Sequence, residues 1–204
     1  AAVDGGFVEN ILVDGVKSLN TGNVLYLRIG DRWSKGKKSN MKNIEIKNVY
    51  AEVPVGKPDK GYLYEGPIED LPRNISPASI VGLPGNPIEN VKLTNITIVY
   101  PGGGNPHYAF VGLSDSALNS IPEMEAAYPE FSQFKELPAW GFYIRHAKNI
   151  TFENLRLTAA QKDYRPAIVL DKVNTVQFKN FSVSEPANKK QIFPYKVTGL
   201  KIIK

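Results

Sequence analysis

The sequence predicts an all-β protein built as a right-handed parallel β-helix, and three observations support that fold class. A short pattern recurs along the 204 residues: an asparagine, an aliphatic residue, a polar residue, a second apolar residue, and soon afterwards another asparagine or glycine. Within each copy apolar and polar residues alternate, which is the period of a strand with one buried face. The asparagines and glycines stand at matching places, and both tolerate a left-handed backbone.

The copies are expected to be short strands that each stop at the second asparagine, or at Gly15, and are followed by the same turn. A single copy cannot bury its apolar face, whereas stacked copies can. The close copies span residues 43–49, 90–96 and 149–155, and looser ones span 10–16 and 175–181. Stacking would bury Ile46, Leu93, Phe152 and Phe178. It would also align an amide ladder made of Asn48, Asn95, Asn154 and Asn180.

Other apolar runs between the copies are expected to be further strands of one domain over residues 1–204. They span residues 24–29, 79–83, 142–144 and 167–170. Long loops at about 54–77 and 100–138 interrupt the repeat, and such loops would flank one lateral face and shape a groove. A short helical stretch is expected over 123–134, limited by Pro122 and Pro129. A β-sandwich is the alternative fold, although it does not require identical turns at each copy.

Composition excludes several classes of function. The chain has no cysteine and two histidines, which excludes disulfides and thiolate metal sites and argues against a multi-histidine metal site. No apolar run approaches the roughly 20 residues that span a membrane. Gly102-Gly103-Gly104 lacks the rest of a phosphate loop, and no cofactor is expected. The net charge of +5 favours an anionic partner. Because the basic residues are dispersed, a nucleic-acid partner is not expected.

Several longer strings resemble the C-terminal part of bacterial proteins in and around glycoside hydrolase family 28, the polygalacturonase family with the pectin lyase fold. The strings cover residues 3–11, 25–32, 77–85, 128–131, 137–146 and 163–170. The resemblance implies inverting hydrolysis of galacturonan or a related pectic polysaccharide by a secreted or periplasmic bacterial protein. The family's Asn-Thr-Asp, Asp-Asp and Gly-His-Gly motifs do not occur here, and Arg28-Ile29-Gly30 matches Arg-Ile-Lys only in part. The catalytic residues are therefore expected on coils N-terminal to Ala1, which would leave this β-helix incomplete at that end.

Two clusters are the candidate substrate-binding residues. The first contains Arg28, Asp31, Arg32 and Trp33 at the end of an expected strand. A guanidinium group binds a carboxylate with two parallel hydrogen bonds, and an indole ring offers a flat face to a sugar ring. The alternative for this cluster is an arginine–aspartate pair that caps one turn of the β-helix, with a half-buried tryptophan.

The second cluster contains Trp140, Tyr143, Arg145 and His146. Strand alternation puts Tyr143 and Arg145 on the face opposite Phe142 and Ile144, where an outward pair would line a sugar groove. The alternative is that this face packs under the long loop that precedes it. A structural histidine is the alternative role for His146.

The remaining acidic candidates favour structural roles. Asp163 and Arg165 are expected to form a pair that stabilises a turn, and the loop acids Glu65, Glu69 and Asp70 are expected to be solvated. Two functions of different class stay open: a part of a pectin-directed glycoside hydrolase that supplies groove walls, and a non-catalytic β-helix that binds polysaccharide or serves as a scaffold. The oligomeric state is also open, since an exposed end would leave unpaired strand edges.

Overall fold

The computed structural model describes residues 1–55, 74–108, 110–134, 136–185 and 191–203. Most of the chain lies in β-strands and its helical segments are short, which confirms the all-β class. Most of the loop expected at 54–77, including Glu65, Glu69 and Asp70, lies outside the described residues. Within the described ranges, no helix combines the length and the apolar character needed to cross a membrane.

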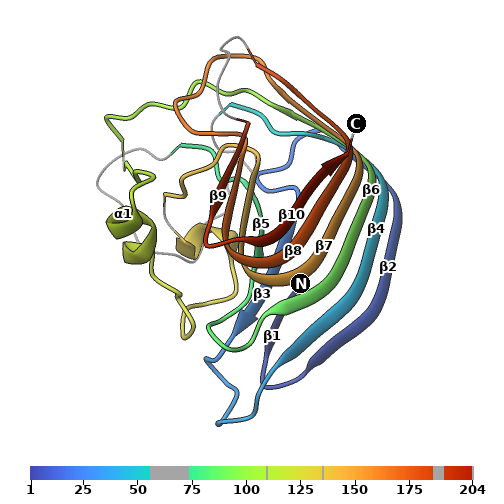
Figure 1. The fold of residues 1–204 in the computed structure, drawn as a ribbon, viewed down its shortest axis with the longest axis vertical. Coiled ribbons are helices and arrows are strands. Elements are labelled where there is room, and N and C mark those ends of the chain that lie inside the picture. Colours follow the sequence, from blue (N-terminus) through green and yellow to red (C-terminus); the bar gives the residue numbers. More distant parts are fainter. Residues whose placement is uncertain (56–73, 109, 135, 186–190, 204) are drawn as a thin grey trace.

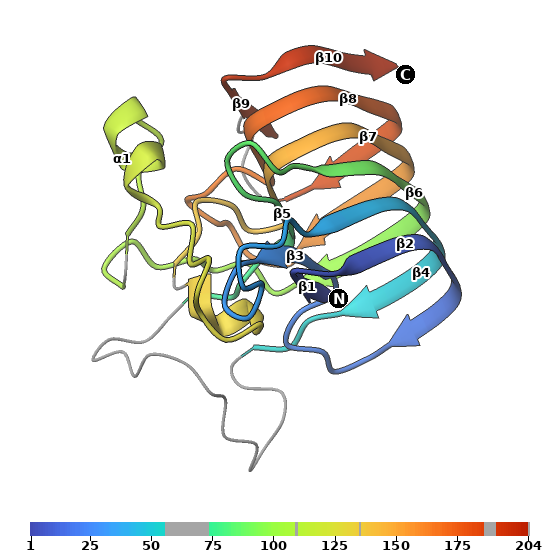
Figure 2. The same cartoon turned by 90° about the horizontal axis from the view of Figure 1, so that it is seen from below.

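The strands form two stacks in which neighbouring strands pair in parallel (Figures 1 and 2). The short stack contains β1 (Ala2–Asp4), β3 (Tyr26–Gly30), β5 (Ala78–Val81), the first residues of β7 (Phe142–Ala159) and β8 (Ile168–Ser184), and β9 (Ile192–Tyr195). The long stack contains β2 (Phe7–Ser18), β4 (Asn40–Glu52), β6 (Ile88–Tyr100), the later parts of β7 and β8, and β10 (Thr198–Ile203).

The chain moves from the short stack to the long stack again and again. Strand β1 leads to β2, β3 to β4 and β5 to β6, while β7 and β8 run through both stacks as single strands. Sandwiches are built mainly from antiparallel pairs. The parallel pairing of the described strands therefore argues against the sandwich alternative.

The asparagines of the repeat bend the strands without ending them. Asn48 and Asn95 have φ angles of 57° and 56°, in the left-handed region, yet β4 and β6 both continue beyond them. This finding corrects the expectation that each strand stops at its second asparagine. A single left-handed residue turns the chain through a corner, while the residues on both sides stay extended and paired with the next strand.

Two ladders of amides run across the long stack. In the predicted ladder, Nδ2 of Asn95 donates to Oδ1 of Asn48 at 2.9 Å, and Asn154 and Asn180 continue the series at 2.7 Å each. This ladder is confirmed. A second ladder, which was not predicted, joins the first asparagine of each copy with distances of 3.1, 2.9 and 3.0 Å along Asn10, Asn43, Asn90 and Asn149.

The core lies between the two stacks. The predicted inward residues of the repeat are all buried: Ile46, Leu93, Phe152 and Phe178. Phe152 stacks on Phe178 with ring centroids 4.8 Å apart, and it meets Phe142 edge to face at 5.3 Å. Because equivalent positions of successive strands lie one above another, identical side chains stack in rows through the core.

A long segment covers the outward face of the short stack. It contains the helix α1 (Asp115–Ser120) and the 3-10 helix η1 (Phe131–Phe134), and it lies beside β3 and β5 in Figure 2. Leu118, Phe134 and Leu137 pack there in a second apolar cluster with Val81 and Tyr143. The helical stretch expected over 123–134 is thus shorter and displaced, because the prolines leave room for only one 3-10 turn.

Candidate functional site

The two predicted clusters come together on the outward face of the short stack. In the strand register Arg28 lies opposite Val81, Val81 opposite Arg145, and Arg145 opposite Asp171. Two clusters that are far apart in the sequence therefore share one column of one sheet face. Residues 111–134, 136 and 137 cover most of this column, so the accessible part of the site lies at its rim.

Arg28 is buried and anchors the covering segment. Its Nη1 donates to the carbonyl oxygen of Tyr128 at 2.9 Å and to that of Ala127 at 3.3 Å, while Nη2 donates to the carbonyl oxygen of Met124. A guanidinium group buried and engaged in this way offers no accessible edge to a uronate carboxylate. The expectation that Arg28 clamps a substrate is corrected: in this structure it fixes the backbone that presents Tyr128.

The second cluster forms a charged network beneath the covering segment. The hydroxyl of Tyr143 donates to Oδ2 of Asp171 at 3.1 Å, and Nε of Arg145 lies 3.2 Å from the same oxygen. Nη2 of Arg145 lies 2.8 Å from Oε1 of Glu123, and Nε2 of His146 lies 3.0 Å from that oxygen. Both carboxylates of the network, buried Asp171 and partly buried Glu123, thus face a cationic or hydrogen-bonding partner.

The electrostatics of this network favour a structural role. Burial raises the pKa of Glu123, but the hydrogen bond with His146 and the charge of Arg145 outweigh it and leave the pKa below its ordinary value. Burial, aided by the negative charge of Asp171, holds the pKa of Tyr143 well above its ordinary value. Near neutral pH the carboxylate of Glu123 is therefore ionised and the tyrosine is protonated, so neither group is poised to exchange a proton.

The sequence identified which residues share a face, and it left open whether that face lines a groove or packs under the preceding loop. Tyr143 and Arg145 do lie opposite Phe142 and Ile144, which belong to the main core. However, both are buried under the covering segment, which is the packing alternative rather than an open sugar groove. The structural alternative also describes His146, which is partly buried and contacts Glu123.

Trp140 belongs to the main core. Its ring is buried and meets Tyr100 edge to face, with centroids 5.6 Å apart. The hydroxyl of Tyr100 donates to the carbonyl oxygen of Gly141 at 2.9 Å, which fixes the start of β7. This burial contradicts the expectation that Trp140 binds substrate, because a buried ring offers no face to a sugar.

Asp163 and Arg165 form the expected pair in the connection between β7 and β8, and they hold neighbouring loops together. Nε and Nη2 of Arg165 donate to the two carboxylate oxygens of Asp163 at 3.0 and 3.1 Å, and Nη1 lies 3.3 Å from Oε1 of Glu136. Asn74 donates to Glu136 at 3.1 Å. Burial raises the pKa of Glu136, although the charge of Arg165 opposes that shift. All three charged residues are buried, so this cluster stabilises the turn.

An accessible patch remains at the rim, and we call it the basic-aromatic patch: residues 31–38 together with Tyr128. The guanidinium carbon of Arg32 lies 5.2 Å from the ring centroid of Trp33 and 5.2 Å from that of Tyr128. Trp33 is 69% exposed and Tyr128 is 41% exposed. A cation between two exposed rings is held in place by their π faces, while its outer donors stay in water.

Local hydrogen bonds fix the loop that carries this patch. The backbone N–H of Asp31 donates to the carbonyl oxygen of Glu125 at 2.7 Å, and Ser34 donates its hydroxyl proton to the Asp31 carboxylate. The backbone N–H of Arg32 lies 3.3 Å from Oδ1 of Asp4. The carboxylate of Asp31 thus orders its own loop, and Arg32 and Trp33 are presented outward from a fixed backbone.

Charge in the patch is strongly biased. Residues 31–38 carry four basic side chains and one acidic side chain, which are Arg32, Lys35, Lys37, Lys38 and Asp31. All five are exposed. Such a local surplus attracts anions more strongly than the modest net charge of the whole chain suggests.

Sequence reasoning missed Tyr128, Glu123 and Asp171. Asp171 gave a usable signal, because a charged residue directly after the apolar run 167–170 needs a buried partner, and the register supplies Arg145. Tyr128 and Glu123 lie in an aperiodic segment, so their places follow only from tertiary contacts. In the part of the chain that the structure describes, no three acidic or histidine side chains are grouped to hold a metal ion.

Comparisons with known proteins give no family for this chain. No protein-family model matches it, and neither the curated proteins nor the solved structures contain a match. The function is therefore inferred from the geometry of the accessible patch and from the resemblance of the sequence strings.

Proposed function

We propose that this chain is a right-handed parallel β-helix that binds an acidic polysaccharide of the pectic type through the basic-aromatic patch. The observation that carries the proposal is the position of Arg32 between two exposed aromatic rings, in a loop with four basic side chains. The strings that resemble the polygalacturonase family support the substrate class. A secreted or periplasmic location fits such a substrate.

General topology supports the handedness in this proposal. Connections between parallel strands of one sheet are right-handed in about 98% of cases, because a right-twisted strand feeds back onto its sheet in that sense. Each passage from one strand of the short stack to the next, such as β1 through β2 to β3, is a connection of this kind.

Each side chain of the patch has a chemical task in this proposal. The guanidinium group of Arg32 binds a uronate carboxylate, and the fork of two N–H groups matches the two oxygens. The rings of Trp33 and Tyr128 contact the apolar faces of neighbouring sugar units. The lysines of the loop supply longer-range attraction, which salt at 0.1 M ionic strength screens beyond about 10 Å.

Binding fits the described residues better than hydrolysis does. Inverting hydrolysis needs two carboxyl groups roughly 6.5–9.5 Å apart on either side of the scissile bond, one of them protonated. The buried acids Glu136, Asp163 and Asp171 all face arginine side chains beneath the surface. Within a polygalacturonase-like hydrolase, the described chain would therefore supply substrate contacts and walls. A non-catalytic binding or scaffold protein is the second candidate.

Titration calorimetry with trigalacturonate tests the proposal. At low salt we expect saturable binding that weakens as salt is added, and about tenfold weaker binding by Arg32→Ala, equivalent to about 1.4 kcal/mol. Arg156→Ala is the matched control, because Arg156 is an exposed arginine of β7 in the long stack. Equal binding of a neutral trisaccharide, or equal effects of the two substitutions, contradicts a uronate site at this patch.

A further inference from the structure

The place of Tyr128 in the basic-aromatic patch is set by a turn of the covering segment. Residues 124–128 form this turn, in which the backbone N–H of Ala127 donates to the carbonyl oxygen of Met124 at 3.0 Å. Met124 has a φ of 54°, in the left-handed region that a residue of this type rarely adopts. Such a conformation persists only where surrounding contacts hold it. The turn that carries Tyr128 therefore needs an anchor.

The buried guanidinium group of Arg28 supplies this anchor. It donates to the carbonyl oxygens of Met124, Ala127 and Tyr128, so three acceptors of one turn converge on one side chain. The guanidinium carbon also lies 5.5 Å from the ring centroid of Phe134, further along the covering segment. A planar fork that stacks on a ring and serves several acceptors at once is a property of arginine, because lysine offers only a point charge.

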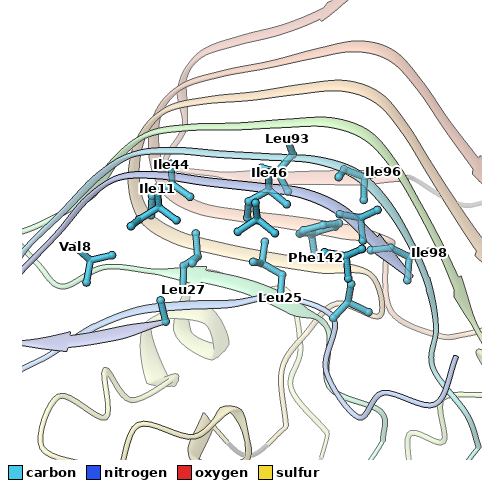
Figure 3. Close-up of a pocket in the computed structure, with 15 residues that line it drawn as sticks. Val8, Ile11, Leu25, Leu27, Ile44, Ile46, Leu93, Ile96, Ile98 and Phe142 are labelled. Atoms are coloured by element: carbon cyan, nitrogen blue, oxygen red, sulfur yellow. The ribbon is translucent and has the colours of Figure 1, made fainter. Parts of the chain in front are cut away.

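The strand that carries Arg28 is fixed from its other side. Arg28 lies between Leu27 and Ile29 in β3, and both neighbours are buried in the main core. Figure 3 shows Leu27 beside an apolar cavity, across from Ile44 and Ile46 of β4. Because side chains alternate along a strand, this packing aims the guanidinium group at the covering segment. The anchor thus stands on a rigid element.

A backbone hydrogen bond joins the anchored turn to the loop that carries Arg32. The N–H of Asp31 donates to the carbonyl oxygen of Glu125 at 2.7 Å. Arg32 follows Asp31 directly, and its guanidinium carbon lies 5.2 Å from the ring centroid of Tyr128. Residues 28–32 therefore both hold the turn and present the cation, so the two halves of the patch are positioned from one strand end.

We propose that Arg28 is a positioning residue for saccharide binding at the basic-aromatic patch. It holds the turn 124–128 so that the ring of Tyr128 already stands beside Arg32 before a ligand arrives. A site that is ordered in advance loses less entropy on binding, which raises its affinity without a further contact. This inference rests on the proposed function, because Arg28 acts on the saccharide only through Tyr128.

A double-mutant cycle with trigalacturonate measures this coupling. Tyr128→Ala removes the ring and is expected to weaken binding about fivefold, within the range of an aromatic contact. Arg28→Met keeps the ring but frees the turn, so it is expected to weaken binding by a similar factor. The double variant is expected to bind no more weakly than the weaker single variant, since both changes remove one contact. Arg28→Lys keeps the charge without the fork, and its affinity is expected to lie between those of the wild type and Arg28→Met.

Arg165→Met is the matched control, because Arg165 is a similarly buried arginine that holds other loops. Arg28 and Arg165 are 1 and 3% exposed, and Arg165 donates to Ile75 and Asp163. Its loss is expected to lower the urea midpoint and to leave saccharide binding unchanged. Circular dichroism confirms that each variant is folded, and Arg28→Lys takes the place of Arg28→Met in the cycle if the latter does not fold. Equal loss of binding in Arg165→Met, additive effects in the cycle, or unchanged binding by the Arg28 variant would overturn the proposal.

Amide hydrogen exchange without ligand separates this inference from the proposed function. The N–H groups of Asp31 and Ala127 report on the turn, and that of Gly104 reports on the loops held by Arg165. The Arg28 variant is expected to speed exchange at Asp31 and Ala127 at least about tenfold and to leave Gly104 unchanged, while Arg165→Met gives the reverse pattern. If trigalacturonate does not bind the wild type, the proposed function fails, and the exchange pattern alone decides whether Arg28 positions the turn. Unchanged exchange at Asp31 and Ala127 would contradict that role.

Discussion

Replacing Asn95 separates two contributions of the asparagine ladder to stability. Asn95 has a φ of 56° and makes two ladder hydrogen bonds, at 2.9 Å to Asn48 and at 2.7 Å from Asn154. Asn95→Gly removes both hydrogen bonds but tolerates the left-handed backbone. Asn95→Ala removes the same bonds and also forces an alanine into that conformation.

The magnitudes follow from these contacts. Two exposed hydrogen bonds contribute about 1–2 kcal/mol together. The left-handed conformation costs alanine about 1–2 kcal/mol, and glycine loses about 0.5–1 kcal/mol through backbone entropy. We therefore expect Asn95→Gly to lower the free energy of unfolding by about 2 kcal/mol, and Asn95→Ala by about 3 kcal/mol.

Urea unfolding followed by circular dichroism measures both changes. Asn174 in β8 is the matched control, because it is an exposed asparagine outside the left-handed region. There the order is expected to invert, with glycine costing more than alanine. If alanine is tolerated at position 95 as well as glycine, the left-handed bend is refuted. If neither variant is destabilised, the ladder contributes nothing.

Three further predictions address the core, the charged network and catalysis. Phe152→Ala is expected to cost about 3–5 kcal/mol in urea unfolding, since it removes the ring stacked on Phe178; a cost below about 1 kcal/mol contradicts the aromatic row. The folded pKa of Glu123 lies below its ordinary value of 4.5, so its contribution is full above pH 4.5 and is lost as pH falls through the folded pKa. Glu123→Gln should therefore flatten the fall in stability below pH 4.5, and an unchanged profile counts against the network. The chain alone is expected to release no reducing sugar from polygalacturonate, and activity abolished by Asp31→Asn would reverse that conclusion.

The repeat made much of the fold predictable. Alternation in residues 43–49 and 149–155 identified the inward side chains, and stacking of like residues identified the ladder through Asn95. The predicted ends of the strands were wrong for a physical reason. A left-handed asparagine looks the same in the sequence whether it ends a strand or bends a continuous one, and the pairing that decides the matter comes from the neighbouring strands.

The site was less predictable because its cover is aperiodic. Alternation correctly placed Tyr143 and Arg145 on one face. The covering segment that packs over this face has no periodic pattern in its sequence that would indicate this packing. Glu123 approaches Arg145 only through that packing. In contrast, Arg32 and Trp33 are neighbours in the sequence, so their joint exposure on one loop was within reach of sequence reasoning.

The two tryptophans offer the most direct measurement of where saccharide binds. The chain has one exposed indole, Trp33, and one buried indole, Trp140, so a ¹H–¹⁵N spectrum holds one indole signal for each. During titration with trigalacturonate, we expect a saturable shift of the Trp33 signal, an unmoved Trp140 signal, and loss of the shift in Arg32→Ala. A Trp33 signal that stays fixed while calorimetry records binding would contradict saccharide binding at the basic-aromatic patch.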